Sequence, residues 1–339
     1  MKSLKEDYYN PFFSHIYVEE AVLEHPRTRA VLAAFPSARR ILIHHYKDVF
    51  CRAGQSCAQQ RRARKLILAS KQGRLLYRGA PVCQDFGNDH FYYTSCVMNC
   101  IYDCEYCYLK GMYPSANIVM FVNLEDIFEE TEALLQKHPV YLCVSYDTDL
   151  LALERITGYV REWSRFAARQ NRLTLEIRTK CAAREYFRDT DPVLGVIYAF
   201  TLSPQAVIEE MEDGTPSLAA RLACVAEAVR AGFAVRLCFD PLMYLPGWQR
   251  HYGEMPGQVW AAVDPDKIVD VSVGSFRISQ DYLKKMRRQE PDSPVAQFPY
   301  QNDHGYCHYP DALMEQMEQY VAGELAKRIP EEKIFRWKF

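Results

Sequence analysis

Short apolar runs alternate along the chain with segments in which apolar residues recur every three or four positions. Six runs have the length and composition of buried strands, and they are Ile118–Val122, Val140–Ser145, Leu173–Ile177, Val196–Leu202, Ala234–Phe239 and Ile268–Val273. A helical segment follows most of them. Successive β-α units predict parallel strands with right-handed crossovers, so the expected fold class is α/β with an open or partial (β/α)6 barrel.

Polar residues indicate where helices begin. Asn123 and Ser217 stand directly before helical segments, and Asp149 precedes another that continues to Trp163; side-chain oxygens at such positions accept hydrogen bonds from free backbone N–H groups. In barrels of this kind the functional residues lie at the carboxyl ends of the strands. A short strand near Phe91–Thr94 is expected to come first, which leaves the Ile118 run as a second strand or an edge.

Length and composition limit the organisation of the chain. Its 339 residues are 49% hydrophobic and 25% charged, enough to bury a full core. We expect an α-rich N-terminal region at 1–88, the barrel at 89–290 and a C-terminal segment at 291–339. Met1–Asp7 leads into polar and aromatic residues instead of a long apolar stretch, which predicts a cytoplasmic protein with reduced thiols and no membrane span.

Charge gives a local signal. A formal net charge of -2 argues against a protein that coats polyanions in general. The N-terminal region nevertheless carries the basic run Arg61-Arg62-Ala63-Arg64-Lys65. This run is interpreted either as a solvated helix face or as a surface that contacts phosphates.

Four cysteines lie within twelve residues, at Cys96, Cys100, Cys104 and Cys107. The last three have the spacing C-x3-C-x2-C and are followed by an aromatic residue. Three thiolates so close together can hold three irons of a cubane [4Fe-4S] cluster and leave the fourth iron open for a substrate or cofactor. The alternative is a structural zinc site with Cys96 as fourth ligand, although zinc sites usually take their ligands from two separated pairs.

This cysteine motif resembles that of the radical S-adenosylmethionine (SAM) enzymes. In those enzymes the open iron binds SAM, and an electron from the cluster cleaves SAM to a 5'-deoxyadenosyl radical. From Phe91 onwards the chain resembles, more closely, the spore photoproduct lyase family, which repairs the thymine dimer 5-thyminyl-5,6-dihydrothymine in ultraviolet-damaged spore DNA. The matching segments are Cys104–Leu109, Val122–Ile127, Cys143–Ser145, Arg178–Lys180, Thr201–Ser203, Glu212–Thr215, Ala231–Phe233 and Asp240–Pro241.

The resemblance implies roles for individual residues. Cys100, Cys104 and Cys107 would hold the [4Fe-4S] cluster, and the residues around SAM would be Ser145, Lys180, Thr201 and Ser203. Cys143 would donate hydrogen to the product radical, with Tyr106 and Tyr108 returning hydrogen to its thiyl radical. Without the resemblance, each of these side chains has an ordinary structural interpretation, such as a buried core cysteine or packing around the cysteine loop.

The family also implies partners: ultraviolet-damaged DNA, and an electron donor such as a flavodoxin or ferredoxin. It implies a location in the spore core if the organism sporulates, and substrate contact by the 291–339 segment. Basic residues upstream of that segment are candidate phosphate contacts or a solvated helix face, namely Arg277, Lys284, Lys285, Arg287 and Arg288.

The chain departs from the family pattern in two places. The family's lesion-binding hairpin carries an arginine beside Gly-Tyr, whereas Asp303–Tyr309 here offers histidines and a cysteine. Cys83 and Cys96 are additional cysteines and rival hydrogen donors. Two other functions therefore stay open: a radical SAM enzyme acting on another substrate, such as a tRNA base or a peptide, and a non-enzymatic zinc or iron-sulfur module that binds nucleic acid.

Overall fold

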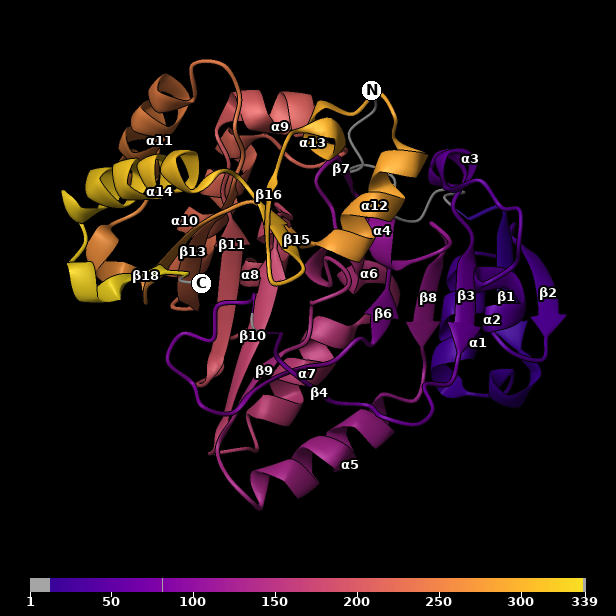
Figure 1. The fold of residues 1–339 in the computed structure, drawn as a ribbon. Coiled ribbons are helices and arrows are strands. Elements are labelled where there is room, and N and C mark those ends of the chain that lie inside the picture. The colour runs from indigo at the N-terminus through magenta and orange to yellow at the C-terminus, as the bar shows by residue number, and fades with distance from the viewer. Residues whose placement is uncertain (1–12, 81, 338–339) are drawn as a thin grey trace.

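The computed structural model describes residues 13–80 and 82–337, so Met1–Asp7 lies outside the described residues. Two sheets organise the molecule (Figure 1). The larger one has eight strands in the order β18-β14-β13-β11-β10-β9-β5-β4, and all its neighbouring pairs are parallel except β4 with β5. Its strands are β4 (Tyr77–Arg78), β5 (Phe91–Tyr93), β9 (Val140–Cys143), β10 (Leu173–Thr179), β11 (Val196–Thr201), β13 (Ala234–Leu242), β14 (Val271–Ser275) and β18 (Ile334–Arg336).

This sheet confirms the α/β fold class with a partial barrel. Five of the six predicted runs form its central strands, although β14 begins at Val271, three residues later than expected. The expected short strand at Phe91 is β5, and it pairs directly with β9. Parallel strands that are buried on both faces have near-continuous apolar sequences, which is why these runs could be recognised.

The Ile118 run is a strand, but it does not belong to the barrel. It forms β8 (Ile118–Phe121), which pairs in parallel with β3 (Leu66–Ala69) and antiparallel with β6 (Val97–Met98). The second sheet has the order β2-β1-β3-β8-β6 and includes β1 (His15–Glu19) and β2 (Arg39–Ile43). The apolar pattern predicted a strand correctly, but it carries no information about which sheet the strand joins.

The N-terminal region is therefore mixed and not only α-rich. Its described part contains the parallel strands β1, β2 and β3 in addition to short helices. These helices are α1 (Pro26–Ala34), α2 (Lys47–Phe50) and α3 (Cys57–Arg62). In Figure 1 this region lies beside the larger sheet, and the cysteine loop connects β6 to β8, two strands of the second sheet.

Helices connect and cover the strands of the larger sheet. They are α5 (Leu124–Leu135), α6 (Glu154–Thr157), α7 (Tyr159–Ala167), α8 (Arg184–Arg188), α9 (Gln205–Met211), α10 (Leu218–Arg230), α11 (Trp248–Ala262), α12 (Gln280–Gln289), α13 (Pro294–Gln297) and α14 (Asp311–Ala326). Ser217 caps α10 as predicted, because its Oγ accepts a hydrogen bond from the N–H of Ala220. Asn123 stands at the start of α5 but makes no capping bond; its Oδ1 accepts from the N–H of Lys71.

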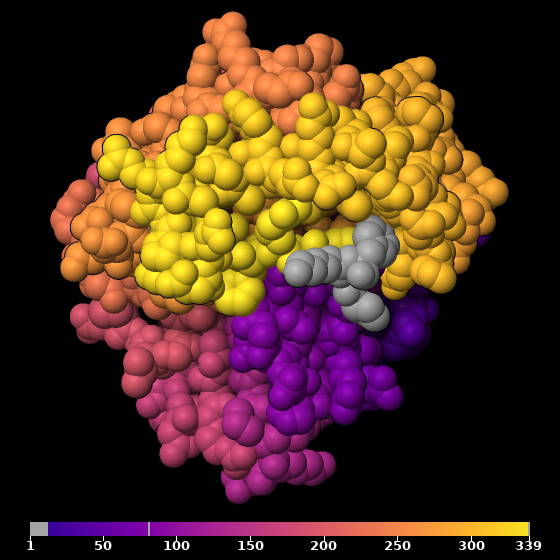
Figure 2. Space-filling view, turned by 60° about the vertical axis from the view of Figure 1, so that its left-hand side comes forward, coloured from indigo at the N-terminus to yellow at the C-terminus, as the bar shows by residue number. Residues whose placement is uncertain are grey.

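The C-terminal segment closes one side of the sheet. A three-stranded sheet combines β15 (Arg277–Ser279) with the hairpin β16 (Gln301–Asp303) and β17 (Tyr306–His308), and α14 then leads to β18 at the edge of the larger sheet. Figure 2 shows this yellow segment against purple residues from the segment before β5. The rings of Phe86 and Phe335, 5.3 Å apart, make one such contact. No described helix combines the length and the apolar character needed to cross a membrane.

Candidate active site

A cavity of about 620 Å³ opens at the carboxyl ends of the parallel strands. Cys143 ends β9, Thr179 and Lys180 lie at the end of β10, and Thr201 ends β11; all of them line this cavity. The three cysteines of the C-x3-C-x2-C motif line it as well. The fold therefore brings together residues that are up to about a hundred positions apart in the sequence, as expected for parallel strands that all end at one edge.

The cysteine loop is built from short, well-paired pieces. β7 (Asp103–Cys104) pairs antiparallel with β12 (Glu212–Asp213), and the Glu105 N–H donates to the Met211 carbonyl at 2.7 Å. The Cys107 N–H then donates to the Cys104 carbonyl at 3.1 Å and leads into α4 (Leu109–Met112). These bonds hold the loop in place as it carries its thiols into the cavity wall.

The chemistry of the three thiols suits a metal cluster. Burial raises the pKa of Cys100 to about 12 and also raises the pKa of Cys104 and Cys107, so a positively charged metal centre is needed to hold all three as thiolates. Within the described residues, the one group of metal-ligating side chains with ligand atoms inside 4.8 Å is Asp303, His308 and Asp311. Cys100, Cys104 and Cys107 do not form such a group, so their sulfur atoms do not all lie within 4.8 Å of one another.

Cys96 is separated from the other three cysteines. It is fully buried in the core, where its thiol lies 3.7 Å from the carbonyl oxygen of Val144, and it does not line the cavity. The donor set in the cavity wall is therefore three thiols with open space beside them. This set fits a cubane cluster with one unligated iron better than the zinc site that uses Cys96.

Of the four residues expected around SAM, three line the cavity. The Ser145 hydroxyl accepts from the N–H of Arg178 at 2.6 Å, and Thr201 is buried at the end of β11. The Lys180 ammonium lies 5.4 Å from the centre of the Tyr106 ring. Burial alone would lower the pKa of Lys180, but Cys104, when it is a thiolate, and the Glu212 carboxylate outweigh this and keep that pKa raised. Lys180 is thus a charged ammonium in the cavity wall.

Ser203 lies behind the cavity and not in its lining. Its hydroxyl donates to Glu212 at 2.8 Å, and the same carboxylate accepts from the Tyr106 hydroxyl at 2.5 Å. Arg221 forms a fully buried ion pair with Glu212. Burial alone would raise the pKa of Glu212, but Arg221 and Lys180 hold it down at about 2. In the sequence, Glu212 stands out only as part of a segment that matches the family. Its place at the centre of this network depends on the pairing of β7 with β12.

Tyr108 has a comparable arrangement around a second carboxylate, Asp147. Its hydroxyl lies 2.6 Å from the Tyr146 carbonyl oxygen and 3.2 Å from Asp147, which also accepts from Tyr113 at 2.7 Å. Burial raises the pKa of Asp147. Sequence reasoning missed Asp147, although its position four residues after Cys143, beyond the end of β9, is a signal that could have identified it.

Two of the three rival thiols face the cavity. Cys143 is buried at the end of β9 and Cys83 comes from the segment between β4 and β5, and both line the cavity, whereas Cys96 does not. The Cys83 Sγ lies 2.6 Å from the Tyr146 hydroxyl, and the Tyr146 ring stacks on Tyr93 at 4.2 Å. Both thiols therefore lie where a substrate in the cavity can reach them.

The predicted phosphate contacts separate into two groups. The Arg277 side chain is 9% exposed and bonded to Asp240 at 3.0 and 3.1 Å and to the Val82 carbonyl at 2.8 Å, so it holds the Cys83 segment in place and is not free for phosphate. Arg287 is likewise bonded to the carbonyls of Ala296 and Phe298. The exposed cations are on α12, at Lys284, Lys285 and Arg288. α12 lies at the mouth of the cavity, because Asp281 and Tyr282 are part of its lining.

Known proteins with similar sequences point to one family. The family described as "Spore photoproduct lyase" matches residues 14–289. A protein of that name from a Geobacillus species is 23% identical over 55% of this chain and 55% of its own length, and one from Bacillus subtilis is 20% identical over 92% of this chain and 96% of its own.

Solved structures agree on the fold. A spore photoproduct lyase complexed with dinucleoside spore photoproduct superposes with a TM-score of 0.81 at 16% identity, covering 96% of this chain and 98% of that one. A variant of the enzyme with bound AdoMet and the same dinucleoside has a TM-score of 0.80 at 17% identity and the same coverage. Since the family match spans most of the chain, the chain belongs to the spore photoproduct lyase family.

Proposed function

We propose that this chain is a radical SAM carbon-carbon lyase that converts the spore photoproduct in DNA back to two thymines. The observation that carries the proposal is the cavity, in which three motif cysteines, a charged lysine and two further thiols in the lining meet at the carboxyl ends of the parallel strands. Family membership supports the same substrate, because solved relatives are described with dinucleoside spore photoproduct and with AdoMet bound.

Cys100, Cys104 and Cys107 would hold a [4Fe-4S] cluster, and SAM would lie against Ser145, Lys180 and Thr201. The Lys180 ammonium provides a cation for the SAM carboxylate, and the two hydroxyls provide partners for its polar groups. Ser203 would act indirectly by holding Glu212. The bound cluster and SAM would supply a 5'-deoxyadenosyl radical, with the electron coming from a donor such as a flavodoxin or ferredoxin.

The remaining steps belong to side chains of this protein. Loss of hydrogen from C6 of the dihydrothymine half lets the bond between the two bases break, which leaves a thymine radical. Cys143 gives that radical its thiol hydrogen and becomes a thiyl radical. Tyr108 and Tyr106 would then relay a hydrogen atom from 5'-deoxyadenosine to the Cys143 thiyl radical, which restores the thiol and allows SAM to be formed again. To enter the cavity the two bases must leave the helix, and this costs less at a damaged, poorly stacked step.

Anaerobic reconstitution with iron and sulfide tests the proposal. The reduced protein should cleave SAM to 5'-deoxyadenosine and should restore thymine in DNA irradiated dry, without consuming SAM in proportion. Replacement of Cys100, Cys104 and Cys107 by alanine should abolish both reactions, whereas Cys224→Ala, a buried cysteine remote from the motif in sequence, should abolish neither. A colourless, zinc-loaded wild type would contradict the proposal.

A radical SAM enzyme with another substrate is the second candidate. The hairpin β16–β17 favours it, because its turn has His304 and Gly305 before Tyr306, and Tyr306 lines the cavity. A protein that cleaves SAM but leaves the spore lesion unchanged would establish this alternative. The residues that contact the substrate would then differ from those of the spore photoproduct lyases, while the cluster site would be the same.

A further inference from the structure

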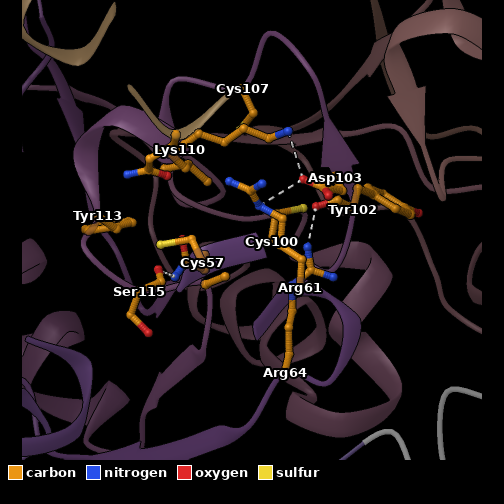
Figure 3. Close-up of a pocket in the computed structure, with 14 residues that line it drawn as sticks. Cys57, Arg61, Arg64, Cys100, Tyr102, Asp103, Cys107, Lys110, Tyr113 and Ser115 are labelled. Carbon is orange, nitrogen blue, oxygen red and sulfur yellow. Dashed lines mark hydrogen bonds and ion pairs between the residues drawn. The ribbon is translucent and has the colours of Figure 1, made fainter. Parts of the chain in front are cut away.

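The basic run that begins in α3 packs against the cysteine loop. A second, small pocket of about 30 Å³ lies there, lined by Arg61, Arg64 and Lys110 together with Cys100 and Cys107 (Figure 3). Since Cys100 and Cys107 line both this pocket and the main cavity, they form a wall between the two. Two arginines of the basic run, Arg61 and Arg64, are therefore directed at the cysteine loop and not at solvent, whereas Arg62 is exposed.

Each cation has a defined partner on the loop. Arg64, 9% exposed, donates to the carbonyl oxygens of Ile101 at 2.9 Å and Tyr102 at 3.3 Å, the two residues directly after Cys100. Asp103 follows, and it accepts from Lys110 at 3.0 Å and lies 3.4 Å from Arg61. Every residue between Cys100 and Cys104 is thus held by a cation.

Arg64 differs from the other two cations in its charge balance. Arg61 pairs with both Asp103 and Glu290, and Lys110 pairs with Asp103, whereas Arg64 forms no ion pair among the described residues. Its Nε–H is buried and has no hydrogen-bond partner in the part of the chain that the structure describes. An unpaired buried N–H costs free energy unless an acceptor is present, and the ligand sulfurs of a bound cluster would be acceptors in the same pocket.

We propose that Arg64 is a positioning residue for the iron-sulfur cluster: its guanidinium fixes the backbone between Cys100 and Cys104, and its uncompensated positive charge raises the cluster's reduction potential. This rests on the proposed function, since it needs a cluster at these cysteines. Reduction adds negative charge to the cluster, and a buried cation beside it favours the reduced form because the surroundings have a low dielectric constant.

Two replacements separate the charge from the hydrogen bonds. Arg64→Met removes both, so the reduction potential, measured by an EPR redox titration, should become more negative, and iron release to a chelator should be about tenfold faster. Arg64→Lys keeps the charge but loses the planar fork; its potential should stay near that of the wild type while iron release is again faster. Arg62→Gln, an exposed neighbour in the same run, should change neither.

The loop itself gives a readout that needs no cluster. In the apoprotein, hydrogen exchange at the amides of residues 101–104 should be faster in both Arg64 variants than in the Arg62→Gln control, because the two carbonyl contacts are lost. If Arg64→Met does not fold, Arg64→Lys decides through iron release and exchange. If the Arg64 variants have the reduction potential, iron release and hydrogen exchange of the wild type, the inference about Arg64 is wrong but the proposed function is unaffected. A wild type that takes up no iron-sulfur cluster would overturn both.

Discussion

Buried carboxylates fix the orientation of the phenols in the cavity wall. Glu212 accepts from Tyr106, and Asp147 accepts from Tyr108 and Tyr113. Hydrogen return through Tyr106 and Tyr108, as proposed, would therefore start from O–H groups whose directions are already set. Neither carboxylate is adjacent in sequence to the tyrosine it serves, which is why the sequence predicted the tyrosines and not their partners.

Cys143 and Cys83 offer a direct test at the residue scale. Cys143→Ala should still cleave SAM and open the lesion, but the thymine radical should persist long enough to be trapped by other reductants, giving adducts that mass spectrometry detects. Cys96→Ala should give clean thymine, because Cys96 does not line the cavity.

Cys83→Ala is also expected to give clean thymine. Adducts from Cys83→Ala, together with clean thymine from Cys143→Ala, would move the donor to the thiol that contacts Tyr146 and leave the lyase proposal intact. Arg277 would then gain a role as well, because it holds the neighbouring Val82 carbonyl.

At the scale of elements, the close contact between α4 and α12 depends on a glycine. A Cβ added at Gly111 would lie 2.3 Å from the backbone carbonyl oxygen of Tyr282, so a side chain there would push α12 away from the cysteine loop. α12 lies at the mouth of the cavity. The position of the exposed basic face of α12 is thus set by the helix that follows Cys107.

Gly111→Ala should accordingly lower the free energy of unfolding by about 1 to 3 kcal/mol, the usual cost of overpacking. Gly257→Ala is the matched control, because Gly257 is in the helix α11 with nothing within 4 Å of an added Cβ. That change should be neutral or stabilising by about 0.5 to 1 kcal/mol. Urea unfolding of the two variants and the wild type measures both effects, and equal stability of the two variants would contradict the prediction.

The larger sheet could be predicted from the sequence because its strands are short apolar runs separated by helices. The strand β8 has the same apolar pattern, but it belongs to the second sheet. Its partner β3 is a four-residue apolar run, Leu66–Ala69, directly after the basic run, and nothing local in either sequence states that the two pair. Asn123 illustrates the same limit, because its Oδ1 bonds the Lys71 backbone, 52 residues away, in place of the helix that it precedes.

At the scale of the whole molecule, the net charge is -2, so electrostatic attraction to DNA depends on local basic surfaces. The helix α12 offers such a surface beside the cavity. Removing the charges of Lys284, Lys285 and Arg288 by substitution with glutamine should weaken binding of lesion-containing duplex DNA. The slope of log binding constant against log salt concentration should also become shallower, by the equivalent of up to about three phosphate contacts, because fewer counterions are released.

Repair of the isolated dinucleoside lesion is the control for this variant. That substrate lacks the flanking phosphates, so its turnover should equal that of the wild type. An unchanged salt dependence with duplex DNA would place the phosphate contacts elsewhere on the protein.

The path of the chain between the two sheets has a consequence for its modularity. After β5 the chain leaves the larger sheet, forms β6, the cysteine loop and β8, and only then returns to β9. A protein cut at the expected boundary between residues 88 and 89 would keep β8 but lose β3, its parallel neighbour, and would also lose Arg64. The strands β1, β2 and β3 therefore cannot be exchanged between relatives independently of the cysteine loop, because a change in these early strands also changes the surroundings of that loop.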